Sequence, residues 1–550
     1  MGNITSRIWR PTIVLTSLIL SVPILTISVS VLEPPSENWK HLKDTILFEY
    51  LGNSLLLTFG VGIGVLIIGV STAWLTVMCR FPGKSFFVWL LLLPMAMPAY
   101  IVAYTYTGMF DFAGPVQTAI RDLTGWGYRD YFFPQIRSMG GAMVMLSLVL
   151  YPYVYLLSRA TFLEQSAGVI EVSRTLDCTP WTVFYLVALP LARPAIVAGL
   201  SLALMETLAD YGTVAYFGLS VFTTGIFRTW FGLGDYSASA KMAAFLLFFV
   251  FTLIIMERVS RKKAQYHNSS GKLTRFSEYE LKGPKAFLAF VCCSLPVFLG
   301  FLLPMSQLVI WAAQTWRDMI DERFFDLIRN SFLLGFGAAM ISVILGLFLA
   351  YGKRIFPGKI TIISVRTASI GYAIPGTVIA VGVIIPFAWL DGSIDSFMRS
   401  NFGISSGLIF SGTIFALMFA YVVRFLALSL QTVESGLGKI KSSMEDASCS
   451  LGCSHQETLF NIHIPLMKSS TITALMIVFV DVMKELPATL ILRPFDFNTL
   501  AVRTFELASD ERLADSSTAA ITIVLVGLFP VIYLSKIISK SRFKKLNNEI

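Results

Sequence analysis

Acidic and phenolic side chains stand inside two segments of this chain that are otherwise apolar. The candidates are Glu206, Asp210 and Tyr211 in the run 192–214, and Asp481, Lys484 and Glu485 in the run 467–490. Carboxylates inside a membrane-spanning segment are costly and tend to mark a pathway or a gate. Lys484 leaves a second interpretation open, because its ammonium could pair with a nearby carboxylate as a purely structural ion pair. Pro487 is expected to loosen the helix at this point, as a gate would need.

The elements that hold these side chains are expected to be membrane-spanning helices. Of the 550 residues, 55% are hydrophobic and 14% are charged, whereas soluble domains carry about 25% charged residues. Many separate apolar runs reach the roughly 17–25 residues that a helix needs to cross a bilayer. We count twelve runs, at 12–32, 52–78, 86–110, 139–158, 192–214, 240–257, 286–312, 330–352, 362–390, 405–430, 467–490 and 517–537. The expected fold is therefore an all-α membrane protein with about twelve spans.

The basic residues gather in alternate inter-span segments, which predicts the orientation. The segments placed in the cytoplasm are the loop with Arg80 and Lys84, 159–190, 258–285, the loop with Lys353, Arg354 and Lys359, 431–466, and the tail from Lys536 to Lys545. The segments 33–51 and 313–329 mix charges and are placed outside. Both termini are therefore expected in the cytoplasm. The net charge of +9 follows this pattern, so we predict a lipid bilayer as surroundings and no nucleic-acid partner.

The chain repeats itself once, at a nearly constant offset in residue number. For example, Phe81-Pro-Gly-Lys84 recurs as Phe356-Pro-Gly-Lys359, and Pro98 with its neighbours recurs at Pro375. Six spans separate equivalent points, so both copies should have the same orientation and be related by an axis along the membrane normal. The expected organisation is a first half at 1–257, a basic cytoplasmic linker at 258–285 and a second half at 286–550. A substrate path on the axis is the natural inference.

One polar segment of each half shows the same internal spacing. In the first copy Glu171 and Asp177 precede Leu189-Pro190, and in the second copy Asp446 and Gly452 precede Ile464-Pro465 at identical distances. Gly452 suits a position just after a helix, where φ is often positive. Ser454-His-Gln-Glu457 is a capping-box pattern that starts a new helix. In the first copy Thr179 is expected to cap a helix in which Pro180 takes the first position.

Each copy therefore predicts a helix, a tight turn and a second helix at the membrane entrance. We call the segments 164–190 and 439–465 the first knob and the second knob.

The repeated pattern resembles the EAA loop of binding-protein-dependent ABC-importer permeases, which have the type I importer fold. The resemblance implies that each knob docks into a cleft of one of two ATPase subunits. The residues it assigns to this coupling are Glu171, Asp177, Pro190, Glu445, Asp446, Gly452 and Pro465. The chain departs from the pattern with Asp177 in place of glycine, and with Asp446, preceded by Glu445, in place of glutamate. The two docking contacts are therefore expected to be unequal.

The chain offers no site of its own for a nucleotide. Gly83-Lys84-Ser85 looks like the end of a phosphate-binding loop, but that loop requires glycine where Met78 stands. We therefore expect ATP to be bound and hydrolysed by a separate subunit, and this chain to be neither an enzyme nor the holder of a cofactor.

The stretches 206–228 and 481–512 are similar to the fused permeases of ferric-iron ABC importers, and the likeness covers essentially the whole chain. It implies a bacterial inner-membrane protein that receives ferric iron from a periplasmic or extracellular iron-binding protein. Ferric ion prefers anionic oxygen ligands, which the candidate carboxylates and Tyr211 offer, although no stable metal site is predicted. Thiamine permeases share the fusion and part of these motifs and are the alternative. A secondary transporter driven by an ion gradient is a further alternative, which failure to co-purify any ATPase subunit would favour.

Overall fold

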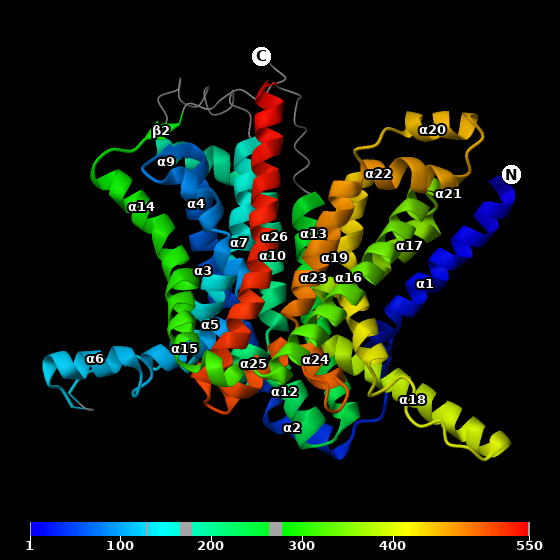
Figure 1. Ribbon diagram of the computed structural model, residues 1–550, viewed down its shortest axis with the longest axis horizontal. Helices are drawn as coiled ribbons and strands as arrows, with labels where there is room; N and C mark the ends of the chain where they lie inside the picture. Colours follow the sequence, from blue (N-terminus) through cyan, green and yellow to red (C-terminus); the bar gives the residue numbers. More distant parts are fainter. Residues whose placement is uncertain (1, 128–129, 165–178, 263–277, 548–550) are drawn as a thin grey trace.

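The computed structural model describes residues 2–127, 130–164, 179–262 and 278–547. Helices dominate these ranges (Figure 1). Ten of the described helices are long and apolar enough to cross a membrane, and two further pairs are bent at a short break, by 89° and 78°, which gives up to twelve spans. The prediction of an all-α protein with about twelve spans is confirmed.

The helices of the first half are α1 (Gly2–Ser30), α2 (Glu37–Thr45), α3 (Leu47–Met78), α4 (Lys84–Leu90), α5 (Ala99–Phe110), α6 (Pro115–Thr124), α7 (Met139–Glu164), α9 (Pro180–Val183), α10 (Leu189–Ala209), α11 (Gly212–Tyr216), α12 (Phe222–Phe227) and α13 (Tyr236–Lys262).

The helices of the second half are α14 (Pro284–Val297), α15 (Leu303–Met319), α16 (Glu322–Ile355), α17 (Lys359–Ala368), α18 (Gly376–Phe402), α19 (Ile414–Leu437), α20 (Ser442–Ser450), α21 (His455–Thr458), α22 (Ile464–Leu466), α23 (Lys468–Met483), α24 (Pro487–Leu492), α25 (Leu500–Ser509) and α26 (Leu513–Asn547).

The predicted repeat is visible in where the helices begin. Five pairs of helices start at the same constant offset in residue number: α3 and α16, α7 and α19, α9 and α21, α10 and α22, and α11 and α24. A five-residue π-helical segment follows the knob helix in both halves, at Phe184–Ala188 and Leu459–His463. The second knob and α9, which belongs to the described part of the first knob, lie on the same side of the molecule, and α1 begins and α26 ends on that side as well (Figure 1). The repeat is therefore parallel, as the even number of spans predicts.

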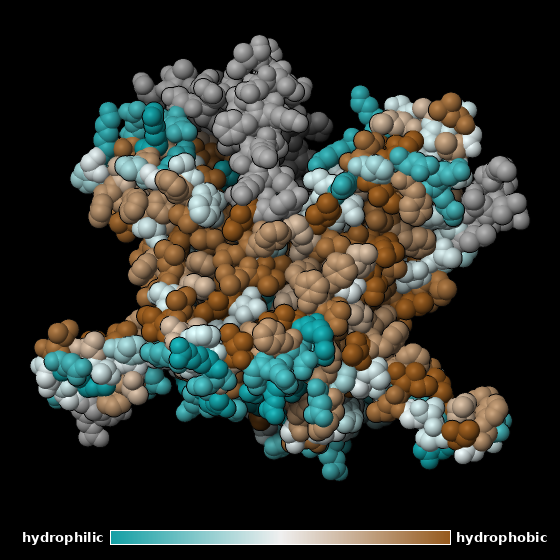
Figure 2. All heavy atoms as spheres, viewed as in Figure 1, coloured by the Kyte–Doolittle hydropathy of each residue, from teal (hydrophilic) through white to brown (hydrophobic). Residues whose placement is uncertain are grey.

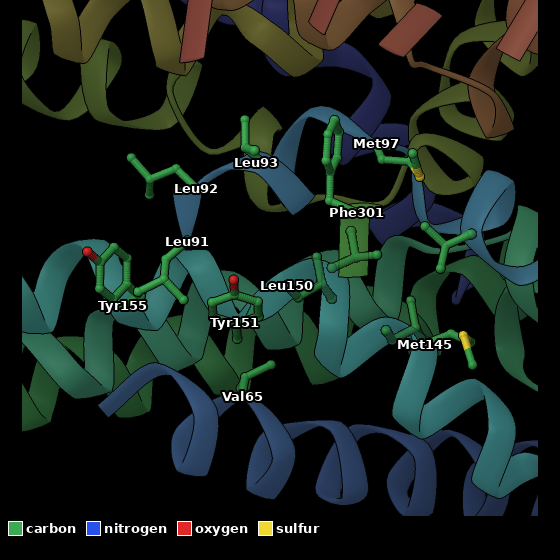
Figure 3. Close-up of a cluster of buried hydrophobic side chains, with 14 of the residues drawn as sticks. Val65, Leu91, Leu92, Leu93, Met97, Met145, Leu150, Tyr151, Tyr155 and Phe301 are labelled. Atoms are coloured by element: carbon green, nitrogen blue, oxygen red, sulfur yellow. The ribbon is translucent and has the colours of Figure 1, made fainter. Parts of the chain in front are cut away.

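The first helix of each half packs against the other half. α1 lies against α17 and α18, where Gly382 allows an approach so close that an added Cβ would collide with the carbonyl oxygen of Pro23. In the same way Gly300, just after α14, lies under the carbonyl oxygen of Leu148 in α7. Figure 3 shows the neighbouring Phe301 among first-half side chains such as Leu93. The two halves of the sequence are thus interlocked in space.

An apolar belt surrounds the middle of the molecule. Figure 2 shows hydrophobic side chains between two more polar ends, one of which carries the knobs. Phe59 and Ile67 on α3 and Phe248 on α13 are among the exposed large side chains. Because helices satisfy their own backbone hydrogen bonds, they can present such side chains directly to lipid.

The end of the linker is tied to the first half. Strand β1 (Cys79–Arg80) pairs in parallel with β2 (Tyr279–Glu280), and the ammonium of Lys84 lies 2.9 Å from a carboxylate oxygen of Glu278. This two-residue ladder adds a small feature that the all-α prediction did not contain.

Breaks in four chain segments surround the interior of the protein. Pro98 and Pro375 precede α5 and α18 with an extended ψ of 140° at both positions. α10 ends at Ala209 and α23 at Met483, and short helices follow each. The break before Pro487 agrees with its predicted loosening of the helix. Each break places helix ends and polar side chains in the centre of the protein.

Candidate functional site

The breaks lie beside a partly open cavity of about 140 Å³ between the two halves. All six side chains predicted for a path or gate line it: Glu206, Asp210, Tyr211, Asp481, Lys484 and Glu485. The lining also includes four residues that the sequence analysis did not single out, Tyr100, Tyr153, Tyr372 and Arg424. The structure therefore brings the candidates of both halves into a single site.

The carboxylates form two pairs related by the repeat, and one pair caps helices. Asp210 and Glu485 occupy equivalent positions of the two halves, each just before a short helix. Asp210 accepts hydrogen bonds from the backbone N–H of Val214, at 3.1 Å, and from the hydroxyl of Thr213, at 3.0 Å. Glu485 Oε1 accepts from the backbone N–H of Ala488 at 3.1 Å. Both carboxylates thus satisfy N–H groups that a helix N-terminus leaves free.

Glu485 also carries the more buried of two ion pairs in the cavity. Arg424 Nη1 lies 3.3 Å from Glu485 Oε1, and the two side chains are only 7% and 4% exposed. Gly376 makes room for this pair, because a Cβ there would collide with both charged groups. The signal for Arg424 was present in the sequence, since an arginine in the apolar run 405–430 requires a counter-ion.

The second carboxylate pair, Glu206 and Asp481, is related by the same offset of the repeat. Asp481 Oδ1 lies 3.0 Å from the ammonium of Lys484. Within the described part of the chain, no hydrogen bond or ion pair joins Glu206, although Arg424, Asp481 and Lys484 all lie within its electrostatic reach. Among the carboxylates that line the cavity, Glu206 therefore makes the fewest hydrogen bonds and ion pairs within the described residues.

Phenol groups complete the lining. The ring of Tyr211 stacks on Phe227 with centroids 3.7 Å apart, so this tyrosine is held in place by packing. Tyr153 and Tyr372 lie within electrostatic reach of both Glu206 and Asp481. In the described ranges no group of three or more histidine, cysteine, aspartate or glutamate side chains is arranged to hold a metal ion. The cavity offers scattered oxygen atoms and not a closed coordination cage.

The second knob has the predicted local structure. Gly452 adopts a φ of +87° between α20 and α21. Ser454 and Glu457 form the predicted capping box, with the Ser454 N–H donating to Glu457 Oε2 at 2.7 Å and the Glu457 N–H donating to Ser454 Oγ at 3.3 Å. A buried hydrogen bond of 2.8 Å between the hydroxyls of Ser448 and Thr458 joins the two helices. This knob is a compact helix–turn–helix unit.

The adjacent acidic residues Glu445 and Asp446 of the second knob have different surroundings. Glu445 Oε1 lies 2.6 Å from Arg354 Nε and 3.0 Å from Nε2 of the buried His463, which fastens α20 to the end of α16. Asp446 is exposed. Of this adjacent pair, Asp446 is the more exposed residue.

The first knob is described from Thr179 onward. The Thr179 hydroxyl accepts from the N–H of Thr182 at 3.3 Å, with Pro180 in the first helical position, as the sequence predicts. Glu171 and Asp177 lie outside the described residues. Pro190 and Pro465 occupy the first turn of α10 and α22.

Comparison with known proteins defines the family. Residues 65–265 and 342–544 match the sequence profile described as "Binding-protein-dependent transport system inner membrane component". The chain belongs to this family. The two matches fall in the two halves, so the chain holds two family domains in one polypeptide. The family consists of transporter subunits and not of enzymes.

Several curated proteins are similar to the chain over long stretches. The Fe(3+)-transport system permease protein FbpB 2 of Haemophilus influenzae is 25% identical over 494 residues, which cover 89% of this chain and 90% of the relative. The ferric transport system permease protein FbpB of Actinobacillus pleuropneumoniae is 23% identical over 540 residues, 93% of this chain and 74% of the relative. The molybdenum transport system permease protein ModB of Escherichia coli is 28% identical over 149 residues, 27% of this chain and 62% of the relative.

Proposed function

We propose that this chain is the fused membrane subunit of an ATP-driven importer and that it carries ferric iron delivered by a solute-binding protein. The observation that carries the substrate assignment is the cavity between the halves. Its lining holds four carboxylates against two cationic side chains, with four phenols. Such oxygen-rich, net negative surroundings suit a small, hard, highly charged cation. Two relatives with high coverage, both ferric permeases by name, support the same substrate.

The proposal includes an orientation and two kinds of partner. The knobs, the basic linker and both chain ends face the cytoplasm of a bacterium, and the chain resides in its inner membrane. Two copies of an ATPase subunit dock on the knobs, and the iron-binding protein docks on the opposite face. The positions of α9, α20, the start of α1 and the end of α26 on one side of the molecule support this orientation (Figure 1).

The exposed aromatic groups of the knobs support docking. Tyr185 and Phe460 occupy equivalent positions of the two knobs and are 58% and 65% exposed. Large apolar side chains on a polar face favour contact with another protein. Because both knobs present an aromatic side chain at the same position, this contact is expected at both docking sites, while the acidic residues that differ between the knobs keep the two sites unequal.

Reconstitution tests the function directly. The chain would be incorporated into proteoliposomes with its ATPase, and ATP hydrolysis would be measured with a ferric-loaded or a thiamine-loaded binding protein. We expect stimulation and iron uptake with the ferric protein only. Stimulation by the thiamine-loaded binding protein alone would contradict the assignment of ferric iron as the substrate. Failure of the chain to retain any ATPase subunit would favour a transporter driven by an ion gradient.

Neutral substitutions test the cavity and the first knob. Glu206→Gln should lower iron uptake while leaving assembly with the ATPase intact, whereas Glu280→Gln, at an exposed position of β2 outside the cavity, should leave uptake unchanged. Normal uptake by Glu206→Gln would remove this residue from the path. Glu171→Ala should weaken the coupling of ATP hydrolysis to the loaded binding protein, and full stimulation in this variant would contradict the docking role.

A further inference from the structure

The two halves of the protein treat an equivalent carboxylate differently. Glu206 is followed three residues later by Ala209, whereas Asp481 is followed three residues later by Lys484. Residues three apart on a helix face each other, so only Asp481 can have a partner at this position. The ion pair between Lys484 and Asp481, at 3.0 Å, therefore has no counterpart in the first half.

The two ion pairs of the cavity also differ in how firmly they are held. Lys484 and Asp481 have side chains that are 21% and 23% exposed, against 7% and 4% for Arg424 and Glu485. A lysine ammonium is a compact, strongly hydrated charge on a flexible stem, whereas the arginine guanidinium is rigid and suits buried pairs. The lysine pair is thus open to the cavity and can separate at lower cost.

The C-terminal end of α23 stabilises the positive charge of Lys484 even when its ammonium is not paired with Asp481. This residue is the C-cap of the helix, where the macrodipole favours a positive charge. The ammonium can therefore move away from Asp481 without losing all electrostatic support.

Buried polar atoms in the lining point to an occupant of the cavity. Tyr100 is 5% exposed and lines the cavity, and its hydroxyl has no hydrogen-bond partner among the described residues. Nε of Arg424, on a side chain 6% exposed, is likewise unpaired within these residues. A buried polar atom left unsatisfied is costly; because the Nε–H of Arg424 can only donate, water molecules that enter the cavity with a hydrated ligand would stabilise both groups.

We propose that Lys484 is a tethered counter-ion that a trivalent cation displaces from Asp481. The incoming cation then lies between Asp481 and Glu206, the two equivalent carboxylates of the halves. Between transport events the ammonium neutralises Asp481, and on arrival of the cation it swings toward the end of α23. This inference rests on the proposed function. Competition by the lysine keeps the cation weakly held, and a conduction path requires binding weak enough for release.

Terbium(III) provides a direct test, because it is a hard trivalent cation whose emission is sensitised by nearby tyrosines. The purified full-length chain in complex with its ATPase would be titrated with terbium in phosphate-free buffer. Lys484→Met should bind terbium about tenfold more tightly than the wild type, because the competing charge is gone. Lys484→Arg should bind terbium no more tightly than the wild type. Glu206→Gln should lose binding, and Lys359→Met, at the exposed start of α17 and outside the cavity lining, should behave as the wild type.

The outcomes separate this inference from the proposed function. Unchanged terbium affinity in Lys484→Met, in a complex that remains monodisperse, would overturn the displacement role even if the wild type imports iron. Binding that survives in Glu206→Gln would overturn the placement of the cation. Tighter binding in Lys484→Met, combined with no iron uptake by the wild type, would support the displaceable cation site and overturn the iron assignment.

Discussion

Replacing Arg424 with methionine removes the cation from the most buried ion pair of the cavity. Arg424 Nη1 and Glu485 Oε1 are 3.3 Å apart, and less than a tenth of either side chain is exposed. Glu485 would remain buried without a counter-ion, and removing one partner of such a pair typically costs about 3–5 kcal/mol. We therefore expect Arg424→Met to unfold at a markedly lower temperature than the wild type in detergent.

A second substitution distinguishes destabilisation by the uncompensated charge of Glu485 from destabilisation by the loss of packing around Arg424. Glu485→Gln in the Arg424→Met background should recover much of the stability, because a neutral amide oxygen can still accept the hydrogen bond from the Ala488 N–H. Lys353→Met is the matched control: its pair with Glu434 has side chains 31% and 35% exposed, and such pairs contribute about 0–1 kcal/mol. The reasoning fails if Arg424→Met unfolds at the wild-type temperature, or if the double variant is no more stable than the single one.

Three further predictions concern a glycine beside the buried ion pair and two residues of the second knob. Gly376→Ala should lower the unfolding temperature, because its Cβ collides with the buried ion pair, whereas Gly392→Ala in the same helix has open space and should not. Glu445→Ala should make the second knob more sensitive to limited proteolysis, whereas the exposed Asp446→Ala should leave proteolysis unchanged and weaken stimulation of the ATPase; equal proteolysis in both would contradict the anchoring role. Gly452→Ala should cost about 1 kcal/mol in the local stability of the knob, because a side chain at positive φ is strained, and hydrogen exchange of α20 and α21 would measure this.

Much of the fold follows from local signals in the sequence. Apolar runs locate the spans, and the polar landmarks of the repeat locate equivalent helices to the residue. Gly452 and Ser454 predict the turn and the cap of the second knob, because both act through their own backbone neighbourhood. The packing of α1 against the second half has no such signal, since it depends on contacts between residues far apart in the chain.

The sequence predicts which charged residues belong to the site better than it predicts how they are arranged. Carboxylates are conspicuous in apolar runs, so the acidic residues of the cavity could be found directly. Their different roles could not be predicted, because Asp210 and Glu485 cap short helices only where the preceding helices break. Tyr153 and Tyr372 could not be predicted as part of the site, since tyrosine is enriched at the interfaces of membrane proteins and nothing in the local sequence marks these two.

A single helix joins each knob to the cavity. α23 starts at Lys468, directly after the second knob, and ends at Met483 beside the Lys484 pair; its 16 residues span about 24 Å. α10 continues the helical segment of the first knob within a single span, and its 21 residues from Leu189 to Ala209 span about 32 Å. A movement of the first knob would therefore reach Glu206 along a continuous helical segment, whereas a movement of the second knob would reach Asp481 only through the 78° bend before α23, so the two carboxylates are expected to respond unequally.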